Sequence, residues 1–215
     1  MENIDEIIIE RQERQKQIEA FFGTLSKIAK QLCAYDWMFI NELNHVDLID
    51  IQKLLDKKDS QLIDFFFEKH FETNIELLKN RLIDSNTKRI NILNEIFKGI
   101  ELKLFSLVIP SIISQIEGIT EEKTGRRFFS TQNNQTKLKQ FADSKNIMYF
   151  DKLLTHPIDT IWEYSRKQNP NNPSRINRHD IIHGTSIDYG TKMNCYKYLS
   201  VLLFVSENLD RLNRK

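Results

Sequence analysis

The stretch LKLFSLVIPSIISQI, residues 102–116, places its large apolar side chains three and four positions apart. Such spacing puts them on one face of an α-helix, so we expect the wider segment 86–120 to form one long helix or two abutting ones. Pro110 interrupts the pattern and predicts either a kink or the start of a new helix. The expected buried stripe consists of Leu102, Phe105, Ile109, Ile112, Ile113 and Ile116.

The rest of the chain contains equally few helix-breaking residues. Its 215 residues include only 6 Gly and 4 Pro, and no window shows the sustained alternation of a strand. The sequence therefore predicts an all-α helical bundle, and its 40% of hydrophobic residues are enough for a proper core. In the first half of the chain, further helices are expected over about residues 2–33, with a weak point at Gly23, after a cap at Asp47, and through the apolar run 62–67. In the second half they are expected at 137–150, 151–167 and 178–183. A last helix is expected to bury the stripe Tyr196, Leu199, Leu202, Leu203 and Leu209.

Two polar segments separate these expected helices. Residues 125–136 predict a loop, and residues 168–174, which read QNPNNPS, predict a linker that ends at a helix-capping Ser174. The length suits one domain or one domain with a smaller appendage. We expect a core region over 86–215 and additional helices in 1–85, which either pack on that core or form a separate unit.

Cysteine usage and hydropathy predict a cytoplasmic, soluble protein that does not contact membranes. Cys33 and Cys195 are far apart and lack a CxxC partner, which favours a reducing compartment over a disulfide scaffold. The first residues have neither the basic start nor the apolar run of a signal peptide. No apolar run approaches the roughly 18 residues that a membrane span needs.

The small net charge of +1 conceals an uneven distribution. Residues 1–123 hold 16 Lys and Arg against 22 Asp and Glu, whereas residues 124–215 hold 15 against 8. The two balances, −6 and +7, add up to the total. A basic half of this size can attract a polyanion such as RNA, although the same imbalance is also typical of an ordinary solvated surface.

The segment NRHDIIHG, residues 177–184, carries the residue types that cleave a phosphodiester. Histidine moves protons near neutral pH, and arginine grips phosphate oxygens with a fixed fork of donors. A plainer interpretation gives Arg178 a surface salt bridge and His183 a favourable place near a helix C-terminus. His179 and His183, four residues apart, would also share a helix face, but a metal site would need a third ligand from elsewhere.

Several features of this half resemble the HEPN superfamily (higher eukaryotes and prokaryotes nucleotide-binding domains). The signature is Arg178, four intervening residues and His183, with a polar residue directly after the arginine. The run 107–118, which reads LVIPSIISQIEG, resembles the helix before the catalytic segment in one branch of this superfamily. The segment 177–191 and the apolar helix after it follow the same order, so the resemblance covers about 86–215. Residues 1–85 carry no such resemblance.

The resemblance implies an all-α bundle, usually dimeric, and often a metal-independent endoribonuclease of toxin, abortive-infection or other microbial defence systems. Members of this kind need no cofactor, and some work with an antitoxin or another operon partner. Other members have lost catalysis and act as modules that bind RNA, nucleotides or proteins. The alternatives for this chain are therefore such a binding module and, from the histidine spacing, a metal-dependent hydrolase.

The roles expected on this basis fall into three groups. Arg178 and His183 would be catalytic, the first clamping the phosphorane and the second transferring protons. Supporting residues would be His179, Asp180, Asn177 and, from the preceding helix, Glu117. RNA contacts are expected from Arg126, Arg127, Arg175 and Tyr189; the run 126–129, which joins two arginines to two phenylalanines, could also stack a base, although such phenylalanines are more often core.

Overall fold

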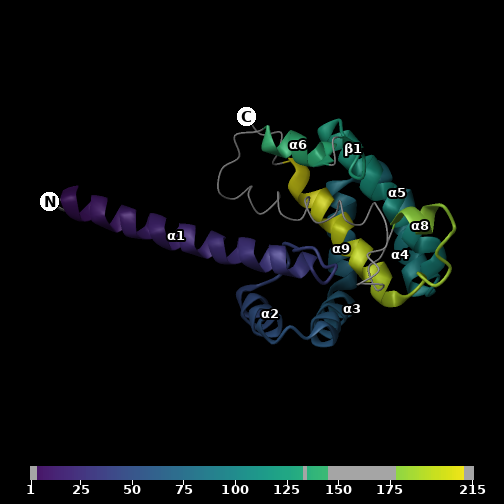
Figure 1. Ribbon diagram of the computed structural model, residues 1–215, viewed down its shortest axis with the longest axis horizontal. Coiled ribbons are helices and arrows are strands. Elements are labelled where there is room, and N and C mark those ends of the chain that lie inside the picture. The colour runs from purple at the N-terminus through teal and green to yellow at the C-terminus, as the bar shows by residue number, and fades with distance from the viewer. Residues whose placement is uncertain (1–3, 133–134, 145–177, 211–215) are drawn as a thin grey trace.

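The computed structural model describes residues 4–132, 135–144 and 178–210, and these are overwhelmingly helical (Figure 1). The all-α class is thereby confirmed. Apart from loops and turns, the described residues contain one non-helical feature, an antiparallel pair of strands with two residues each. The elements are α1 (Ile4–Cys33), α2 (His45–Lys57), α3 (Ser60–Ser85), η1 (Thr87–Arg89), α4 (Ile90–Glu101), α5 (Phe105–Thr124), β1 (Thr131–Gln132), β2 (Gln135–Thr136), α6 (Lys137–Asp143), α8 (Arg178–Ile182) and α9 (Lys192–Asn208).

The centre of the fold is the last helix, α9, which packs along α5 and also along α3. Thr191 begins α9 by accepting the N–H of Asn194 on its side-chain oxygen. The stripe predicted for this helix is confirmed, since all five of its members are buried. Each fully buried leucine stabilises the fold by about 1.5–3 kcal/mol, so α9 is a principal source of stability.

After the short η1, residues 90–124 form two α-helices, and the break between them does not lie at Pro110. The chain turns after α4 through Lys103, which has a left-handed φ of 59°, and α5 begins at Phe105. Of the two outcomes expected for Pro110, the start of a new helix is wrong, because Pro110 lies inside α5, and a kink there stays a prediction. Leu102 was expected in the buried stripe but is exposed, because it lies at this turn. The four isoleucines of the stripe are buried.

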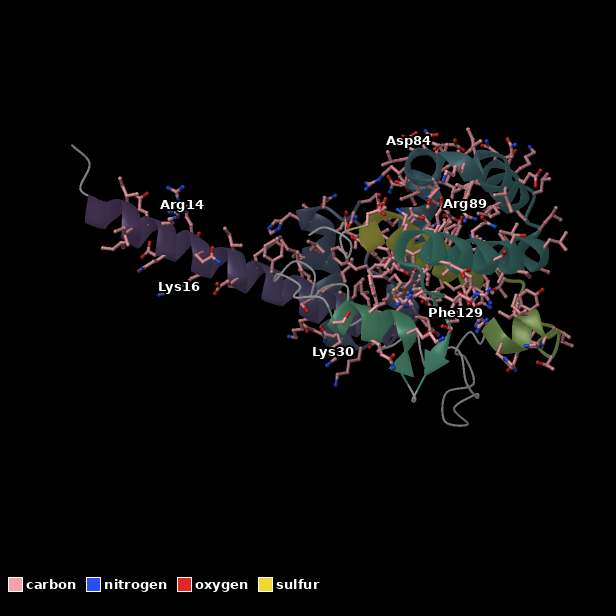
Figure 2. The ribbon with its side chains drawn as sticks, turned by 90° about the horizontal axis from the view of Figure 1, so that it is seen from above. Arg14, Lys16, Lys30, Asp84, Arg89 and Phe129 are labelled. Atoms are coloured by element: carbon pink, nitrogen blue, oxygen red, sulfur yellow. The ribbon has the colours of Figure 1, made fainter. Side chains whose placement is uncertain are left out.

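Helix α1 runs without interruption through Gly23, where the sequence indicated a weak point. Its last two turns are buried through Ile28, Ala29 and Leu32. Its first half projects away from the other helices, as Figure 1 and the positions of Arg14 and Lys16 in Figure 2 show. Up to Phe21, α1 exposes several large apolar side chains, namely Ile7, Ile8, Ile9, Ile18 and Phe21.

The start of α2 corrects one expected cap. Asn44, not Asp47, is the N-cap residue: its side chain accepts the N–H groups of Val46 and Asp47. Asp47 completes a capping box by accepting the N–H of Asn44. Among the phenylalanines of α3, Phe67 is buried but Phe65 is exposed, so only part of the apolar run 62–67 reaches the core.

Residues on both sides of position 85 contribute to a single apolar cluster. Phe71 of α3 stacks on Tyr196 of α9 with ring centroids 5.2 Å apart. The backbone N–H of Met38 donates to the hydroxyl of Ser200 at 3.1 Å. The helices of 1–85 thus pack on those of 86–215, while a domain boundary at 85 stays a prediction. Within the described residues, no helix combines the length and apolarity needed to cross a bilayer.

Candidate functional site

Helix α8 begins with the arginine of the motif. A buried isoleucine attaches it to the core, and a glycine ends it. Ile181 is buried and anchors α8 to the core. Gly184 leaves the helix with a left-handed φ of 72°, which a glycine adopts without strain. The carbonyl oxygen of Asp180 accepts the N–H groups of Thr185 and Ser186. The predicted short helix that ends at Gly184 is therefore confirmed.

Arg178 lies between a carboxylate of α5 and an aromatic ring of the loop that follows α5. Its Nη1 is 3.8 Å from Oε1 of Glu117, and both side chains are about one quarter exposed. Its guanidinium carbon lies 4.4 Å from the ring centroid of Phe129, within cation–π range. Nε of Arg178 and Oε2 of Glu117 have no hydrogen-bond partner within the described residues. The arginine is thus fixed on two sides, and one of its donors, the buried Nε, has no partner among the described residues.

Glu117 is a carboxylate with a perturbed environment. Burial raises its pKa above the ordinary value, while the charge of Arg178 and the backbone N–H groups of Phe129 and Phe128 oppose that rise. Burial disfavours the charged form, and the arginine and the amides favour it. Glu117 is therefore suited to holding Arg178 in place, which is the supporting position expected for it.

The two histidines of the motif lie together on the outside of the fold. The ring centroids of His179 and His183 are 4.2 Å apart, which confirms that they share a helix face. Both residues are exposed. Arg178 and His183 are five positions apart, which corresponds to roughly 140° around a helix. The histidine pair therefore faces solvent on a different side of α8 from the guanidinium. Asp180, between the two histidines, is half-buried.

A metal site at these histidines would need a third ligand. Among residues 4–132, 135–144 and 178–210, no three side chains of His, Cys, Asp or Glu gather closely enough to hold a metal ion. Cys33 and Cys195 are both buried, and neither forms a disulfide.

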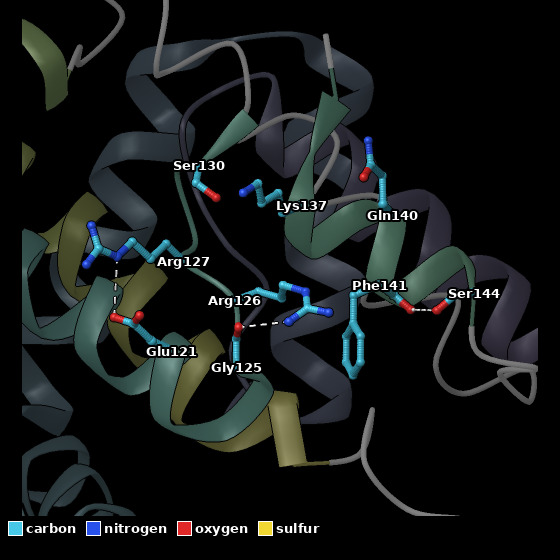
Figure 3. A pocket seen from close by; sticks show the side chains of 9 residues that line it. All are labelled: Glu121, Gly125, Arg126, Arg127, Ser130, Lys137, Gln140, Phe141 and Ser144. Atoms are coloured by element: carbon cyan, nitrogen blue, oxygen red, sulfur yellow. Dashed lines mark hydrogen bonds and ion pairs between the residues drawn. The ribbon is translucent and has the colours of Figure 1, made fainter. Parts of the chain in front are cut away.

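In the loop after α5, the two arginines and the two phenylalanines point to different environments. Phe128 and Phe129 are buried in the core, so they are not exposed for stacking on a base. Arg126 and Arg127 instead line a cavity of about 710 Å³ between the end of α5 and the start of α6 (Figure 3). Nε of Arg127 lies 3.4 Å from Oε2 of Glu121. The loop therefore presents cations on its outer side and buries its aromatic rings.

Tyr189 donates a hydrogen bond to a backbone oxygen that Pro110 leaves without its usual donor. In a regular helix the N–H of residue 110 would donate to the carbonyl oxygen of Ser106, but proline lacks that N–H. The hydroxyl of Tyr189 donates to this oxygen at 2.8 Å. Gly190 also lies against Ser106, since a Cβ on it would be 3.2 Å from the Ser106 Cα. Tyr189 thus attaches the loop after α8 to α5, and its expected contact with RNA stays a prediction.

Tyr189→Phe should lower the free energy of unfolding by about 1 kcal/mol, because the Ser106 carbonyl oxygen loses its donor. Pro110→Ala supplies a backbone N–H for the same oxygen, so the loss caused by Tyr189→Phe should be smaller in a Pro110→Ala background. Urea denaturation of the four proteins of this cycle measures the coupling. Equal losses in both backgrounds would contradict the explanation.

Other expected site residues fall outside the described residues. These are Asn177 and Arg175, together with the expected helix 151–167, the end of the helix expected at 137–150, the linker 168–174 and its capping Ser174.

Sequence reasoning did not nominate Phe129 as a partner of Arg178, because its contact depends on how the loop folds back. It also missed Lys137 and Phe141, which line the cavity. A basic residue and an aromatic residue at the start of an expected helix were the available signals. Comparison of the chain with protein-family models, with curated proteins and with solved structures gave no match.

Proposed function

We propose that this protein is a metal-independent endoribonuclease of the HEPN type that cleaves single-stranded or loop RNA by transesterification. The observation that supports this most is the arrangement of α8. Arg178 is held against Glu117 and Phe129, and an exposed His183 follows directly at the end of the same helix. Helix α8 and the residue that follows it thus supply a group that grips phosphate and a group that moves protons, on different sides of the helix.

The reaction uses the nucleophile that RNA itself carries. An unprotonated His183 accepts the proton of the 2′-hydroxyl while the 2′-oxygen attacks the adjacent phosphorus. Arg178 neutralises the charge that develops on the phosphorane oxygens. The bond from phosphorus to the 5′-oxygen then breaks, and that oxygen receives a proton from a histidine. The products are a 2′,3′-cyclic phosphate and a 5′-hydroxyl, and no water is consumed.

Two proton transfers favour a homodimer in which two copies of His183 serve one cleft. The surface around α8 supports such an arrangement, because several large apolar side chains are exposed there. They are Leu107 in the first turn of α5, Ile182 in α8 and Ile187 in the loop after it, with exposed fractions of 69%, 48% and 92%. The hydrogen bond of Tyr189 to Ser106 holds that loop beside the first turn of α5. Apolar surface of this kind marks protein–protein contacts.

Leu107→Asp should convert the dimer into a monomer and reduce RNA cleavage by at least about tenfold, because a charge in an apolar contact strongly disfavours association. Leu77→Asp in α3 is the matched control, since Leu77 is also an exposed leucine. Light scattering after size-exclusion chromatography gives the mass, and a fluorescent RNA gives the rate. A Leu107→Asp protein that stays dimeric and active would exclude this interface.

The reaction class can be tested on the unmodified protein. Purified protein is incubated with total RNA in the presence of EDTA, and the ends of the fragments are mapped. Fragments that end in cyclic phosphates are expected. Cleavage that stops with EDTA would favour a metal-dependent hydrolase acting through His179 and His183. Binding of RNA without cleavage would favour the non-catalytic module.

A role in microbial defence or toxin-type growth control, in the cytoplasm and with an antitoxin or operon partner, follows from the resemblance of residues 107–118 and 177–191 to HEPN sequences. The uneven charge supports an RNA partner, because the basic excess of 124–215 includes Arg126, Arg127 and Arg178.

A further inference from the structure

The cavity after α5 has the size and the charge of a site for an anionic ligand. Its volume of about 710 Å³ lies within the range of about 300–1,000 Å³ that is usual for small-molecule sites. It is lined by three cations, Arg126, Arg127 and Lys137, and by one carboxylate, Glu121. Glu121 pairs with Arg127, so the lining keeps an excess of two positive charges. Figure 3 shows Arg126 and Lys137 on the side of α6, while Arg127 turns toward Glu121.

The same cavity also offers groups that suit a nucleobase. Phe141 of α6 lines it, and the guanidinium carbon of Arg126 lies 5.9 Å from the centroid of that ring. The amide of Gln140 and the hydroxyl of Ser130 can donate or accept hydrogen bonds at a base edge or a ribose. An aromatic face beside an arginine, flanked by polar groups, is the combination by which proteins hold unpaired nucleotides.

The cavity lies one helical turn from the contact that holds Arg178. Glu117 and Glu121 are four residues apart on α5, a rise of about 6 Å. The first pairs with Arg178 and the second with Arg127. The connecting loop links both places as well, because Phe129 lies under Arg178 while Arg126 and Arg127 face the cavity.

We infer that this cavity binds the nucleotide next to the scissile phosphate, with Lys137 and Arg126 on its phosphate and Phe141 against its base. The place of the cavity along an RNA strand rests on the proposed function. Binding of a nucleotide does not, because it requires no cleavage. Arg126 thereby keeps the RNA-contacting role expected from the sequence, and Lys137, Gln140 and Phe141 are added to it.

Calorimetric titration with adenosine and uridine 5′-monophosphates tests the cavity, with inorganic phosphate as the comparison ligand. The wild-type protein should bind a nucleotide about tenfold more tightly than phosphate, since a stacked base adds roughly that factor. Lys137→Ala and Arg126→Ala should each weaken nucleotide binding by about tenfold. Phe141→Leu should weaken nucleotide binding but leave phosphate binding unchanged. Lys98→Ala, an exposed lysine of α4, is the matched control and should have no effect.

The outcomes separate this inference from the proposed function. Failure of both nucleotides to bind, or binding unchanged by Lys137→Ala and Arg126→Ala, would overturn the subsite even if RNA is cleaved. Equal affinity for phosphate and nucleotides, unaffected by Phe141→Leu, would overturn the assignment of a nucleotide. Nucleotide binding that depends on these residues, in a protein that cleaves no RNA, would support the subsite and overturn the ribonuclease. If both hold, Lys137→Ala should raise KM for RNA and leave kcat nearly unchanged.

Discussion

Arg178→Ala and His183→Ala are each expected to lower the rate of RNA cleavage in EDTA by about 10²–10⁴-fold. The reasons differ for the two residues. Without Arg178 the phosphorane charge has no clamp beside Glu117 and Phe129. Without His183 the 2′-hydroxyl loses the group that accepts its proton. The measurement is the initial rate on a fluorescent single-stranded RNA at saturating concentration.

Controls separate the loss of chemistry from the loss of structure. Arg178→Ala leaves the half-buried carboxylate of Glu117 without its cation, so its thermal unfolding should be measured beside its activity. Arg178→Lys keeps the charge but not the planar fork, and it should recover only part of the rate. His183→Asn keeps a polar side chain at an exposed position and should be as stable as wild type. Full activity in folded Arg178→Ala or His183→Ala would exclude the proposed site.

Arg81→Met should lower the free energy of unfolding at pH 8 by about 2–3 kcal/mol, because it leaves two buried carboxylates facing each other. Arg81 of α3 forms ion pairs with Glu42 and, at 3.0 Å, with Glu207, whose side chains are 3% and 6% exposed. The loss should fall short of the largest values for buried pairs, because Arg81 itself is 38% exposed. Urea denaturation monitored by circular dichroism measures it.

The pH dependence of stability provides the stronger test of this cluster. Burial and the neighbouring Glu42 raise the pKa of Glu207 from 4.5 to about 7, against the opposing charge of Arg81. A pKa that is higher in the folded protein means that protonation stabilises the fold. This contribution is complete below about pH 4.5 and is lost as pH rises through about 7. Wild type should therefore lose about 2–3 kcal/mol of this contribution between pH 4.5 and 8.

Glu207→Gln isolates that contribution, because glutamine imitates the neutral carboxyl group at every pH. The variant should exceed wild type in unfolding free energy at pH 8 and approach it at pH 5. In the Arg81→Met background, Glu207→Gln should restore most of the loss at pH 8. A difference between wild type and Glu207→Gln that does not change with pH would contradict the raised pKa of Glu207.

The sequence by itself determined the helical class and the positions of several helices, because both depend on local properties. A period near 3.6 in apolar residues identifies the face of α5 that holds Ile109 and Ile116 and the stripe of α9, whatever lies opposite. Gly184 marks the end of α8 because it adopts a left-handed backbone conformation without strain. Because these signals depend only on neighbouring residues, a short stretch of sequence is enough to reveal them.

Only the tertiary structure decided which of these residues meet. The contact of Arg178 with Glu117 joins segments 61 positions apart, and periodicity carries no distance between segments. Likewise, nothing local shows that the oxygen left without a donor by Pro110 is satisfied by Tyr189. The same limit applies to the exposed Leu102, which fits its stripe by spacing but lies at a turn whose position depends on how α4 packs against α5. Packing selects among faces that local preferences leave equivalent, and so it determined the surroundings of the candidate site.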